Sequence, residues 1–465
     1  MRETIIQFGE GNFLRGFVDD FIDILNRKGL YDGSIVVVKP RPERKDSAEQ
    51  EPSAFRKLTT QHGVYNLILR GIENGQAVSR MREIHSISRT IDPYQDVEAF
   101  LRLARQKDLK FIISNTTEAG IVFDENCKFT DRPALSFPGK LTQLLYARFE
   151  SGLPGFILLP CELIDNNADE LKNCVLQYAK LWELGDDFKG WIEKENTFAN
   201  TLVDRIVTGY PKEEAAAICR QIGWDDQLID TAEPYHLWAI EGNFESELPL
   251  KAAGLNVIWT KDIAPIKKRK VRILNGAHTS MVFPALLYGL ETVGECLEDE
   301  TVSAFLKHYL FTYAVPLLHA YQSDTSSSVE EGKTAAHPDD LAFAEAVLER
   351  FANPFIHHQL RSIALNSISK FSVRVLPTAI DCRQKNGYFP KAAAFSLAAL
   401  IRFYKTDKPQ DDPAQIAFIR EHSVEEIVQS SLWGASLEDM LEDVKTAYDM
   451  IAAGKLKEAF IWAMT

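Results

Sequence analysis

The sequence predicts an α/β fold in which an N-terminal Rossmann-type domain, built on a parallel sheet, is followed by an all-α C-terminal domain. Three observations predict this fold. Strand and helix patterns alternate from residue 4 onward, the strand runs are continuously apolar, and only helical patterns follow residue 265. Continuous apolar runs are typical of parallel strands that helices cover on both faces. We therefore place the first domain at residues 1–264 and the second at residues 265–465.

The first domain opens with a strand–helix–strand unit. Residues 4–8 and 34–38 are short apolar runs, so both are expected as strands. Between them, apolar residues recur on one helical face over residues 13–26. Further strands are expected at 109–114, 155–160 and 255–259, with helices at 95–107 and 139–150. This alternation predicts a parallel sheet with right-handed crossovers.

The second domain is expected to be wholly helical. Amphipathic patterns cover residues 271–290, 300–320, 340–351, 355–370, 390–404 and 437–463. Polar segments rich in turn-forming residues separate several of them, as at 384–387 and 405–413.

Composition and charge exclude several classes of protein. The chain has 465 residues, of which 45% are apolar, and its net charge is −14, which disfavours nucleic-acid binding. It has no apolar run of about 18 residues, and its first residues are not expected to form a signal peptide. None of the six cysteines forms a C-x-x-C pair, which favours free thiols over a zinc or redox motif. We expect a cytoplasmic protein without metal, membrane or nucleic-acid partners, and the sequence sets no oligomeric state; a monomer is compatible with it.

A glycine-rich turn joins the first strand to the first helix. It carries Gly9, Gly11 and Gly16, whereas the usual G-x-G-x-x-G fingerprint places its third glycine at position 14. Glycines let a backbone turn sharply and approach a pyrophosphate, which the N–H groups of a helix start then bind. Because the turn opens the first βαβ unit, it favours nucleotide binding over an ordinary tight turn.

The end of the second strand leaves the choice of nucleotide open. An acid usually follows that strand and binds the ribose hydroxyls of NAD. Here Lys39 and Arg41 follow it, and basic residues usually accompany the 2′-phosphate of NADP. The alternative is that both are solvated loop charges, so these residues do not choose between NAD and NADP.

Three polar residues follow the domain boundary. On a helix at about 100° per residue, Lys270, Asn275 and His278 fall within about 140° of one another. A lysine can give a proton to a developing alkoxide, while asparagine and histidine hydrogen-bond the same oxygen. The alternatives are a solvated face for the basic run 267–272 and a structural histidine.

The same residues form a K-x4-N-x2-H signature, and the chain resembles the mannitol dehydrogenase family of polyol-specific long-chain dehydrogenases. The resemblance runs over nearly the whole chain. The segments that carry it are 5–17, 111–121, 158–167, 200–211, 270–278 and 353–371. It implies a Rossmann domain followed by a helical domain.

The resemblance also implies an NAD-dependent oxidoreductase that needs no metal. Within the family, the matching segments are most similar to enzymes that interconvert D-tagaturonate and D-altronate in hexuronate breakdown. Lys270 would be the general acid and base, while Asn275 and His278 would orient and polarise the substrate oxygen. The alternatives are fructuronate reduction, a mannitol-type polyol dehydrogenase, or a non-catalytic nucleotide-binding sensor, which the presence of all three signature residues disfavours.

By the same resemblance, two segments would surround the dinucleotide. The first is the glycine turn and the second follows the strand at 109–114, at the strand ends where open α/β sheets bind cofactors. Their residues are Gly9, Gly11, Asn12, Phe13, Gly16, Asn115, Thr116, Thr117 and Glu118. NAD is the expected cofactor, and the residues alone leave NADP open.

Several residues are candidates for the substrate pocket. Asp204 matches a pocket position of the family, and its alternative is an ion pair with Arg205 or another basic neighbour. Mannitol dehydrogenases carry an active-site asparagine in a CDN motif that reads Cys-Glu-Leu163 here, which favours a uronate over a polyol. Asn167, a few residues further on, is expected to contribute instead.

A uronate substrate also needs a cation for its carboxylate. Lys370 and Arg374 lie four residues apart and so share one helix face, which makes them candidates. The alternative is a pair of surface cations on an ordinary helix.

Overall fold

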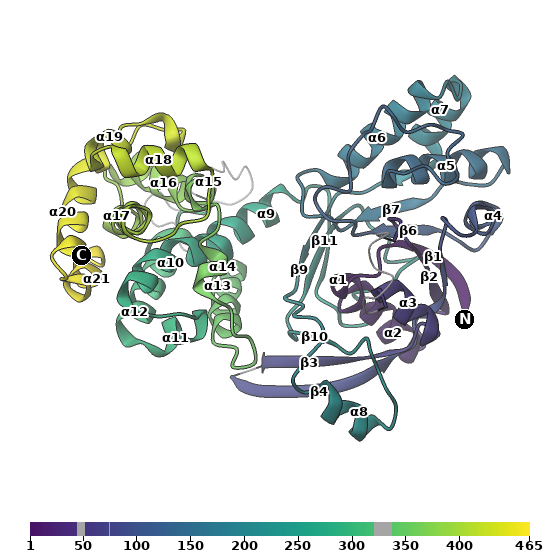
Figure 1. The fold of residues 1–465 in the computed structure, drawn as a ribbon, viewed down its shortest axis with the longest axis horizontal. Helices are drawn as coiled ribbons and strands as arrows, with labels where there is room; N and C mark the ends of the chain where they lie inside the picture. Colours follow the sequence, from purple (N-terminus) through teal and green to yellow (C-terminus); the bar gives the residue numbers. More distant parts are fainter. Residues whose placement is uncertain (44–51, 74, 320–336) are drawn as a thin grey trace. The chain divides into compact units, whose positions relative to one another are not determined.

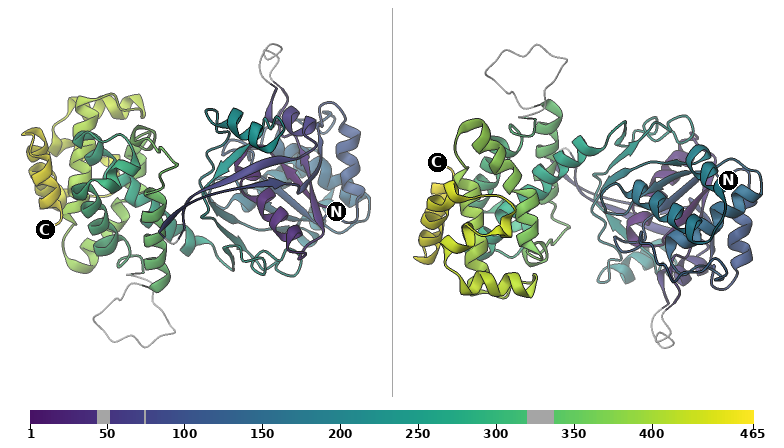
Figure 2. Two further views of the ribbon diagram at one scale, coloured as in Figure 1. Left: turned by 90° about the horizontal axis from the view of Figure 1, so that it is seen from below. Right: turned by 90° about the horizontal axis from the view of Figure 1, so that it is seen from above.

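The computed structural model describes residues 1–43, 52–73, 75–319 and 337–465, shown in Figures 1 and 2. Its contacts divide the chain into two compact units. The N-terminal unit comprises Met1–Arg70 and Val78–Ile263, and the C-terminal unit comprises Gly71–Ala77 and Ala264–Thr465. The first is α/β, and the described part of residues 264–465 contains helices but no strand. The predicted fold class is confirmed.

The N-terminal unit is built on a six-stranded sheet in the order β5–β2–β1–β6–β7–β8, with every pair parallel. The strands are β1 (Arg2–Phe8), β2 (Gly33–Val38), β5 (Ile87–Ile91), β6 (Phe111–Ser114), β7 (Ile157–Pro160) and β8 (Thr197–Phe198). Taken along the chain, this is the 3-2-1-4-5-6 order of the doubly wound dinucleotide-binding fold. The order reverses between β1 and β6, and such sheets bind ligands beyond the strand ends at that point.

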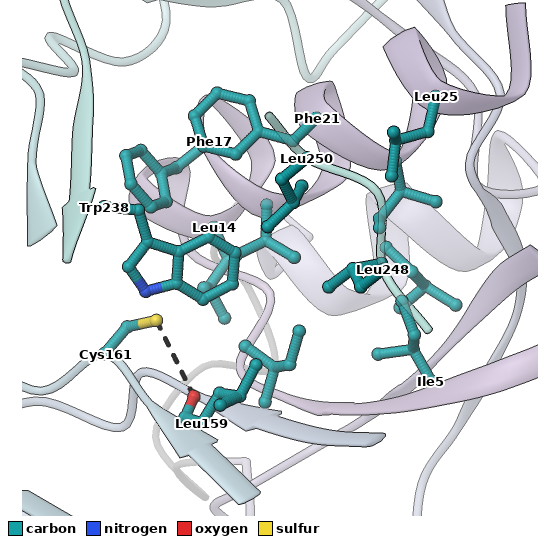
Figure 3. Close-up of a cluster of buried hydrophobic side chains, with 14 of the residues drawn as sticks. Ile5, Leu14, Phe17, Phe21, Leu25, Leu159, Cys161, Trp238, Leu248 and Leu250 are labelled. Atoms are coloured by element: carbon teal, nitrogen blue, oxygen red, sulfur yellow. Dashed lines mark hydrogen bonds between the residues drawn. The ribbon is translucent and has the colours of Figure 1, made fainter. Parts of the chain in front are cut away.

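Helices cover both faces of this sheet. On one face lie α1 (Asn12–Arg15), α2 (Val18–Arg27) and α3 (Ala54–Thr60), and on the other lie α4 (Val97–Arg102), α5 (Phe137–Glu150), α6 (Asn167–Leu181) and α7 (Asp186–Glu195) (Figure 1). Alternate strand residues enter the two layers, so that Ile5 packs in the first and Ile6 in the second. Figure 3 shows the first layer around Trp238. Burial on both faces explains why the strand runs are continuously apolar.

Two smaller sheets complete the N-terminal unit, and the sequence predicted only one of their strands. One contains β10 (Asp230–Ala232), β3 (Tyr65–Glu73) and β4 (Gln76–Ile84), and the other contains β12 (Val257–Thr260), β11 (Leu237–Glu241) and β9 (Thr201–Asp204). A further helix is α8 (Ala215–Ile222). Strands this short, or as polar as β4, carry a weak local signal, and pairing with distant segments defines them.

The helix expected over residues 13–26 is interrupted. α1 is a single turn, and α2 begins only at Val18. The break lies where the chain packs closely, because a Cβ on Gly16 would lie 2.9 Å from Cγ1 of Val207. Phe17 is fully buried and stacks edge-on against Trp238 (Figure 3). The glycine turn is therefore followed by one helical turn rather than by a long helix. The start of this helical turn has unpaired N–H groups, but its helix dipole is small.

The C-terminal unit is a set of packed helices. Its earlier helices are α9 (Ala264–Lys270), α10 (Gly276–Tyr288), α11 (Val293–Glu298), α12 (Glu300–His308), α13 (Pro338–Phe351), α14 (Leu360–Ile363), α15 (Ser367–Arg374) and α16 (Leu376–Asn386). Its later helices are α17 (Lys391–Thr406), α18 (Pro413–Glu421), α19 (Val424–Val428), α20 (Leu441–Ala452) and α21 (Leu456–Ala463). Two π-helical turns occur at Val271–Asn275 and Tyr309–Ala314. The buried helix α17 packs against α10 and α20.

Two of the long helices expected in this unit are divided. The expected helix 355–370 begins only at Leu360 and stops before Asn366, which adopts a left-handed conformation with φ 52°. The Asn366 N–H donates to the carbonyl of Gln410, and this distant contact ends the helix. The expected helix 437–463 is divided at Gly454, whose φ of 74° suits glycine alone after a helix end.

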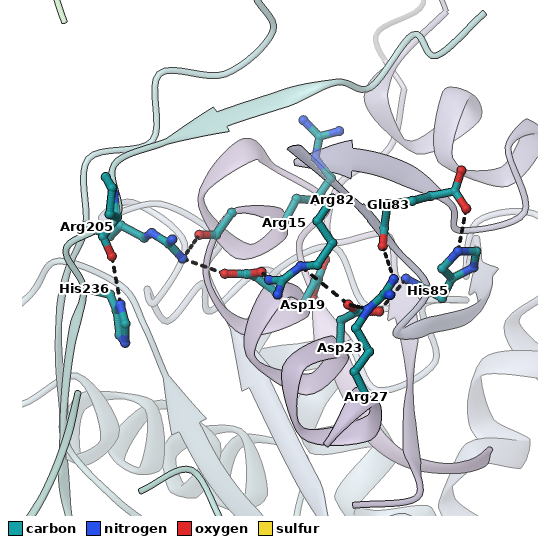
Figure 4. A network of polar contacts seen from close by, with 12 residues as sticks. Arg15, Asp19, Asp23, Arg27, Arg82, Glu83, His85, Arg205 and His236 are labelled. Atoms are coloured by element: carbon teal, nitrogen blue, oxygen red, sulfur yellow. Dashed lines mark hydrogen bonds and ion pairs between the residues drawn. The ribbon is translucent and has the colours of Figure 1, made fainter. Parts of the chain in front are cut away.

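A buried cluster of charged groups lies beside the glycine turn (Figure 4). Arg15 is almost fully buried, with its guanidinium 3.8 Å from the Asp230 carboxylate. Asp19 lies in the same cluster, and its Oδ1 atom has no hydrogen-bond partner in the described residues. Burial, partly offset by Arg15, raises the pKa of Asp19 to about 8. Burial therefore favours the protonated form of this carboxyl in the native state.

Asp19 should make stability depend on pH. A raised folded-state pKa means that the stabilisation is complete below the unfolded value, 3.8, and is lost as the pH rises through about 8. Asp19→Asn cannot ionise, so the melting temperature of the variant should fall less than that of the wild type between about pH 6 and 9. Thermal melts over this range measure the difference. Parallel curves for the two proteins would contradict the assignment.

Candidate active site

The glycine turn after β1 lies against the chain that leaves β6. Gly9 has φ 119°, and a Cβ there would lie 2.8 Å from the backbone oxygen of Asn115. The Asn115 N–H in turn donates to the carbonyl of Phe8 at 3.0 Å. Gly11 is different, because an added Cβ would meet no atom within 4 Å. Gly9 is thus required by the fold, whereas Gly11 leaves open space at the strand ends.

The residues after Gly11 are held in place by their own contacts. Asn12 is exposed, and its Oδ1 accepts a hydrogen bond from Arg15 at 2.6 Å. Its amide lies so close to Gly209 that a Cβ there would approach within 2.2 Å. Phe13 stacks on Phe17 with the ring centroids 5.0 Å apart. These contacts with the core therefore fix the position of the turn's backbone.

The second predicted cofactor segment follows β6. A buried carboxylate, Glu162, accepts hydrogen bonds from the backbone N–H and the hydroxyl of Thr116, each at 2.9 Å, and from the hydroxyl of Ser114 at 3.0 Å. Thr117 is exposed in a left-handed conformation, φ 76°, which is strained for a β-branched residue. Glu118 is exposed. Glu162 was not predicted as a site residue, and its only signal in the sequence is its position two residues after the end of β7.

A cavity opens at the ends of these strands. Its walls come from the residues after β2, from the segment after β6 and from the start of α5. The lining includes Pro40, Arg41, Thr116, Thr117, Val122, Leu135 and Phe137. Val122 and Leu135 are large apolar side chains that stay more than half exposed. Apolar walls with one planar cation suit a flat aromatic base such as adenine.

Paired glycine variants test this segment. Gly11→Ala should leave the melting temperature unchanged, because φ is −67° and no atom is nearby, yet it should weaken dinucleotide binding by filling the open space. Gly9→Ala should lower stability by about 1–3 kcal/mol as well, because its conformation and the Asn115 oxygen both oppose a side chain. Thermal melts and NADH fluorescence titration separate the two effects. Unchanged NADH affinity in Gly11→Ala would remove Gly11 from the cofactor site.

The three signature residues of the C-terminal unit surround a π-helical turn. Lys270 ends α9, Asn275 ends the turn, and His278 lies in the first turn of α10. The sequence predicted one continuous α-helix here, in which Lys270 and Asn275 would point about 140° apart. A π turn bonds residues five apart, so it brings these two side chains onto nearly the same face.

Gly276 holds the π turn in place. Its N–H donates to the carbonyl of Val271, five residues earlier. A Cβ on Gly276 would lie 2.9 Å from the Tyr309 hydroxyl and 3.1 Å from the backbone oxygen of Arg374. The close approach of these two segments therefore depends on glycine at this position.

His278 keeps one polar atom available. The His278 ring is buried, stacks on Phe351 with centroids 4.0 Å apart, and meets His358 edge-on. Its Nε2 atom has no hydrogen-bond partner within the part of the chain that the structure describes. Burial, and then the neighbouring His358 and Arg350, hold the pKa of His278 well below its usual value. His278 is therefore a neutral imidazole with one open nitrogen.

The basic run 267–272 is not simply a solvated face. Lys268 donates to the carbonyl of Leu318 at 2.6 Å, and Arg269 lies 3.9 Å from the Asp340 carboxylate. Arg272 donates to Thr378 and pairs with Asp381 at 3.1 Å. At least three of these cations therefore form hydrogen bonds or ion pairs that stabilise the packing of this segment against neighbouring helices.

Lys370 and Arg374 lie on α15, near His278. Both contribute positive charge at the His278 ring. Lys370 donates to the carbonyl of Ile363 at 3.0 Å, whereas the half-buried Arg374 guanidinium makes no hydrogen bond or ion pair with any described residue. Arg374 is therefore the better placed of the two to bind an anion.

The structure places the other two substrate candidates in the N-terminal unit. Asn167 is fully buried, and its amide bonds the backbone of Pro160, Glu162 and Thr201. These contacts occupy the whole side chain, so the expectation that Asn167 reaches the substrate is not supported. Asp204 is buried at the end of β9, and the neighbouring Arg205 pairs with Asp20 at 2.9 Å.

Three further features concern the described residues as a whole. No three His, Cys, Asp or Glu side chains gather there as a metal site requires. No described helix is long and apolar enough to cross a membrane. All six cysteines are free thiols.

Comparison with known proteins identifies the family. The sequence profile of the mannitol dehydrogenase Rossmann domain matches residues 3–252, and that of the mannitol dehydrogenase C-terminal domain matches residues 262–452. The chain belongs to the mannitol dehydrogenase family. It is therefore an oxidoreductase that acts on CH–OH groups with a nicotinamide cofactor, and the predicted family is confirmed.

Curated relatives within this family share much of the sequence. The altronate oxidoreductase of Bacillus subtilis (strain 168) is 43% identical over 456 residues, which cover 94% of this chain and 90% of that protein. The altronate oxidoreductase of Yersinia enterocolitica is 45% identical over 413 residues, covering 87% and 80%.

Solved structures of the family share the fold. A substrate-free D-sorbitol dehydrogenase matches with a TM-score of 0.83 at 22% identity, over 99% of this chain and 95% of that one. Mannitol 2-dehydrogenase from Pseudomonas fluorescens, solved with NAD and D-mannitol, matches with a TM-score of 0.70 at 20% identity, over 99% and 94%.

Proposed function

We propose that this chain is an NAD-dependent tagaturonate reductase, also called altronate oxidoreductase, which interconverts D-tagaturonate and D-altronate. The observation that carries the proposal is the likeness of 43–45% to proteins named altronate oxidoreductase over most of the chain. The unpartnered cation near His278 supports it independently, because a uronate differs from a neutral ketose by a carboxylate.

The carboxylate of the substrate would bind at Arg374. Its guanidinium can donate two parallel hydrogen bonds to a carboxylate, and it has no competing acid among the described residues. The charge of Lys370 adds to the attraction from the same helix face. A polyol or neutral ketose would leave the half-buried Arg374 guanidinium without a counter-charge, which disfavours the mannitol-type alternative.

Lys270, Asn275 and His278 would act on the reacting oxygen. During reduction, the Lys270 ammonium gives its proton to the oxygen as the carbonyl becomes an alcohol, and during oxidation the amine takes that proton back. The open Nε2 of His278 and the Asn275 amide donate hydrogen bonds that stabilise negative charge on this oxygen. A neutral imidazole suits this role, because it holds the oxygen without competing with Lys270 for the proton.

The N-terminal unit fits a nicotinamide dinucleotide. The open space at Gly11 leaves room for the pyrophosphate, and the cavity beside Arg41 suits the adenine. Thr116 and Thr117 line the same cavity at the switch point of the sheet. When bound, the nicotinamide supplies or accepts the hydride. Asp204 is proposed to contribute to the substrate pocket, as its buried position at a strand end permits.

A substrate panel tests the proposal. D-tagaturonate, D-fructuronate and D-fructose are offered separately with NADH, and the loss of NADH absorbance is followed. The proposal expects the highest kcat/KM for tagaturonate. A preference for fructuronate or fructose would keep the family but overturn the substrate, and NADH binding without any turnover would favour a nucleotide sensor.

A further inference from the structure

The cation that follows β2 is enclosed by acids. Lys39 directly follows β2 and is about 5% exposed. Its ammonium lies 2.8 Å from the Asp92 carboxylate and 3.6 Å from that of Glu43, with the ring of Phe55 5.1 Å away. Lys39 stands where NADP-binding folds bind the 2′-phosphate, but its positive charge is already paired with acidic side chains.

The strand register explains why Asp92 stands there. β2 and β5 are parallel neighbours, and Val38 pairs with Ile91 at their ends. The next residues of the two strands are Lys39 and Asp92, so both leave the sheet at the same level. The Lys39 N–H donates to the carbonyl of Ile91 at 3.0 Å. The acid that usually follows the second strand is thus supplied by the neighbouring strand.

A further acid faces this position from the glycine turn. Glu10 carries a buried carboxylate oxygen, Oε2, without a hydrogen-bond partner in the described parts of the chain. Burial raises the pKa of Glu10, while the charges of Lys39 and Arg41 oppose the shift. Arg41 is exposed on the wall of the cavity, and its charge acts on the Glu10 carboxyl. The charge of Glu43 is balanced separately by Arg56.

We propose that Asp92, with Glu43, selects NAD(H) over NADP(H) by pairing with Lys39 and keeping it away from the ribose. A 2′-phosphate would bring a dianion beside Asp92, Glu43 and Glu10, with Lys39 unable to neutralise it. The 2′-hydroxyl of NAD brings no such charge. This inference rests on the proposed function only in taking the cofactor to be a nicotinamide dinucleotide. It concerns nucleotide binding by the N-terminal unit and does not depend on the identity of the sugar substrate.

Asp92→Asn is the direct test. The asparagine keeps the Oδ1 acceptor that holds the Tyr94 N–H at 3.0 Å, but it no longer pairs with Lys39. Titration by quenching of protein fluorescence measures the Kd of NADH and of NADPH without any substrate. The wild type should bind NADH more tightly. The variant should bind NADPH about 10- to 100-fold more tightly than the wild type does, the range expected for one charge-assisted contact, with little change for NADH.

Two further variants separate the causes. Lys39→Met combined with Asp92→Asn should abolish the NADPH gain, because the gain needs the released ammonium. Glu3→Gln is the matched control, since Glu3 forms a comparable carboxylate pair with Arg89 of β5, outside the cofactor cavity. It should leave both Kd values unchanged.

The outcomes distinguish this inference from the proposed function. An unchanged NADPH Kd in a folded Asp92→Asn variant that still binds NADH overturns the selector, as does equal binding of both nucleotides by the wild type. If Asp92→Asn fails to fold, Glu43→Gln must give a smaller gain in the same direction, and no gain there overturns the inference. NADH binding without tagaturonate turnover overturns the substrate assignment alone, whereas failure of both nucleotides to bind overturns both.

Discussion

Replacing Lys270 by alanine is expected to lower turnover by about 10²–10⁴ and to leave NADH affinity nearly unchanged. The reason is that this residue, which ends α9 beside the π turn, is proposed to supply the proton for the alkoxide, whereas the proposed dinucleotide-binding residues belong to the N-terminal unit. Steady-state kinetics with tagaturonate and an NADH titration measure the two quantities separately.

Two variants sharpen this test. Lys270→Arg keeps a positive charge but cannot release its proton, so turnover should stay low if proton transfer is the role of Lys270. Lys267→Ala removes a cation one turn earlier on the same helix and should leave turnover near the wild-type value. Near-normal turnover in Lys270→Ala would remove Lys270 from the mechanism.

Arg374→Ala should lower kcat/KM for tagaturonate by about 10²-fold, mainly through KM, because the substrate carboxylate loses a charge-assisted contact worth about 1.5–3 kcal/mol. Reduction of fructose, which lacks the carboxylate, should not fall. Arg374→Lys should recover part of the loss, since it restores the charge without the two parallel donors.

A second arginine of the same unit gives the control. Arg361 on α14 is exposed and pairs with Asp407 at 3.0 Å. Arg361→Ala should leave the kinetics of tagaturonate unchanged. An equal loss of kcat/KM for tagaturonate and fructose in Arg374→Ala would show that Arg374 supports the fold of the site and does not bind the carboxylate.

The central sheet could be predicted because its signal is local. β2 is fully buried along its length, and its run of β-branched residues indicates this burial directly in the sequence. The alternation with helices predicted a parallel sheet but not the order of its strands, and the short strands β5 and β8 were not predicted. The interruption of the helix at Gly16 and Phe17 could not be predicted, because it depends on contacts with Val207 and Trp238, nearly 200 residues or more further along the chain.

The candidate site shows the same division. Residue types and spacing were enough to select Lys270, Asn275 and His278. The π turn that aligns the first two was not predictable, since it depends on the fit of Gly276 against Tyr309 and Arg374. The pairing of Lys39 was hidden for a similar reason, because its partner Asp92 lies 53 residues away and only the strand register brings the two together.

We propose that this dehydrogenase acts on a sugar acid. The most direct measurement is the rate of NADH formation from NAD⁺ with D-altronate and, separately, with D-mannitol. We expect a kcat/KM for altronate that is about 10²-fold or more above that for mannitol, because only altronate carries a carboxylate, which Arg374 is proposed to bind. Equal or faster oxidation of mannitol would contradict it.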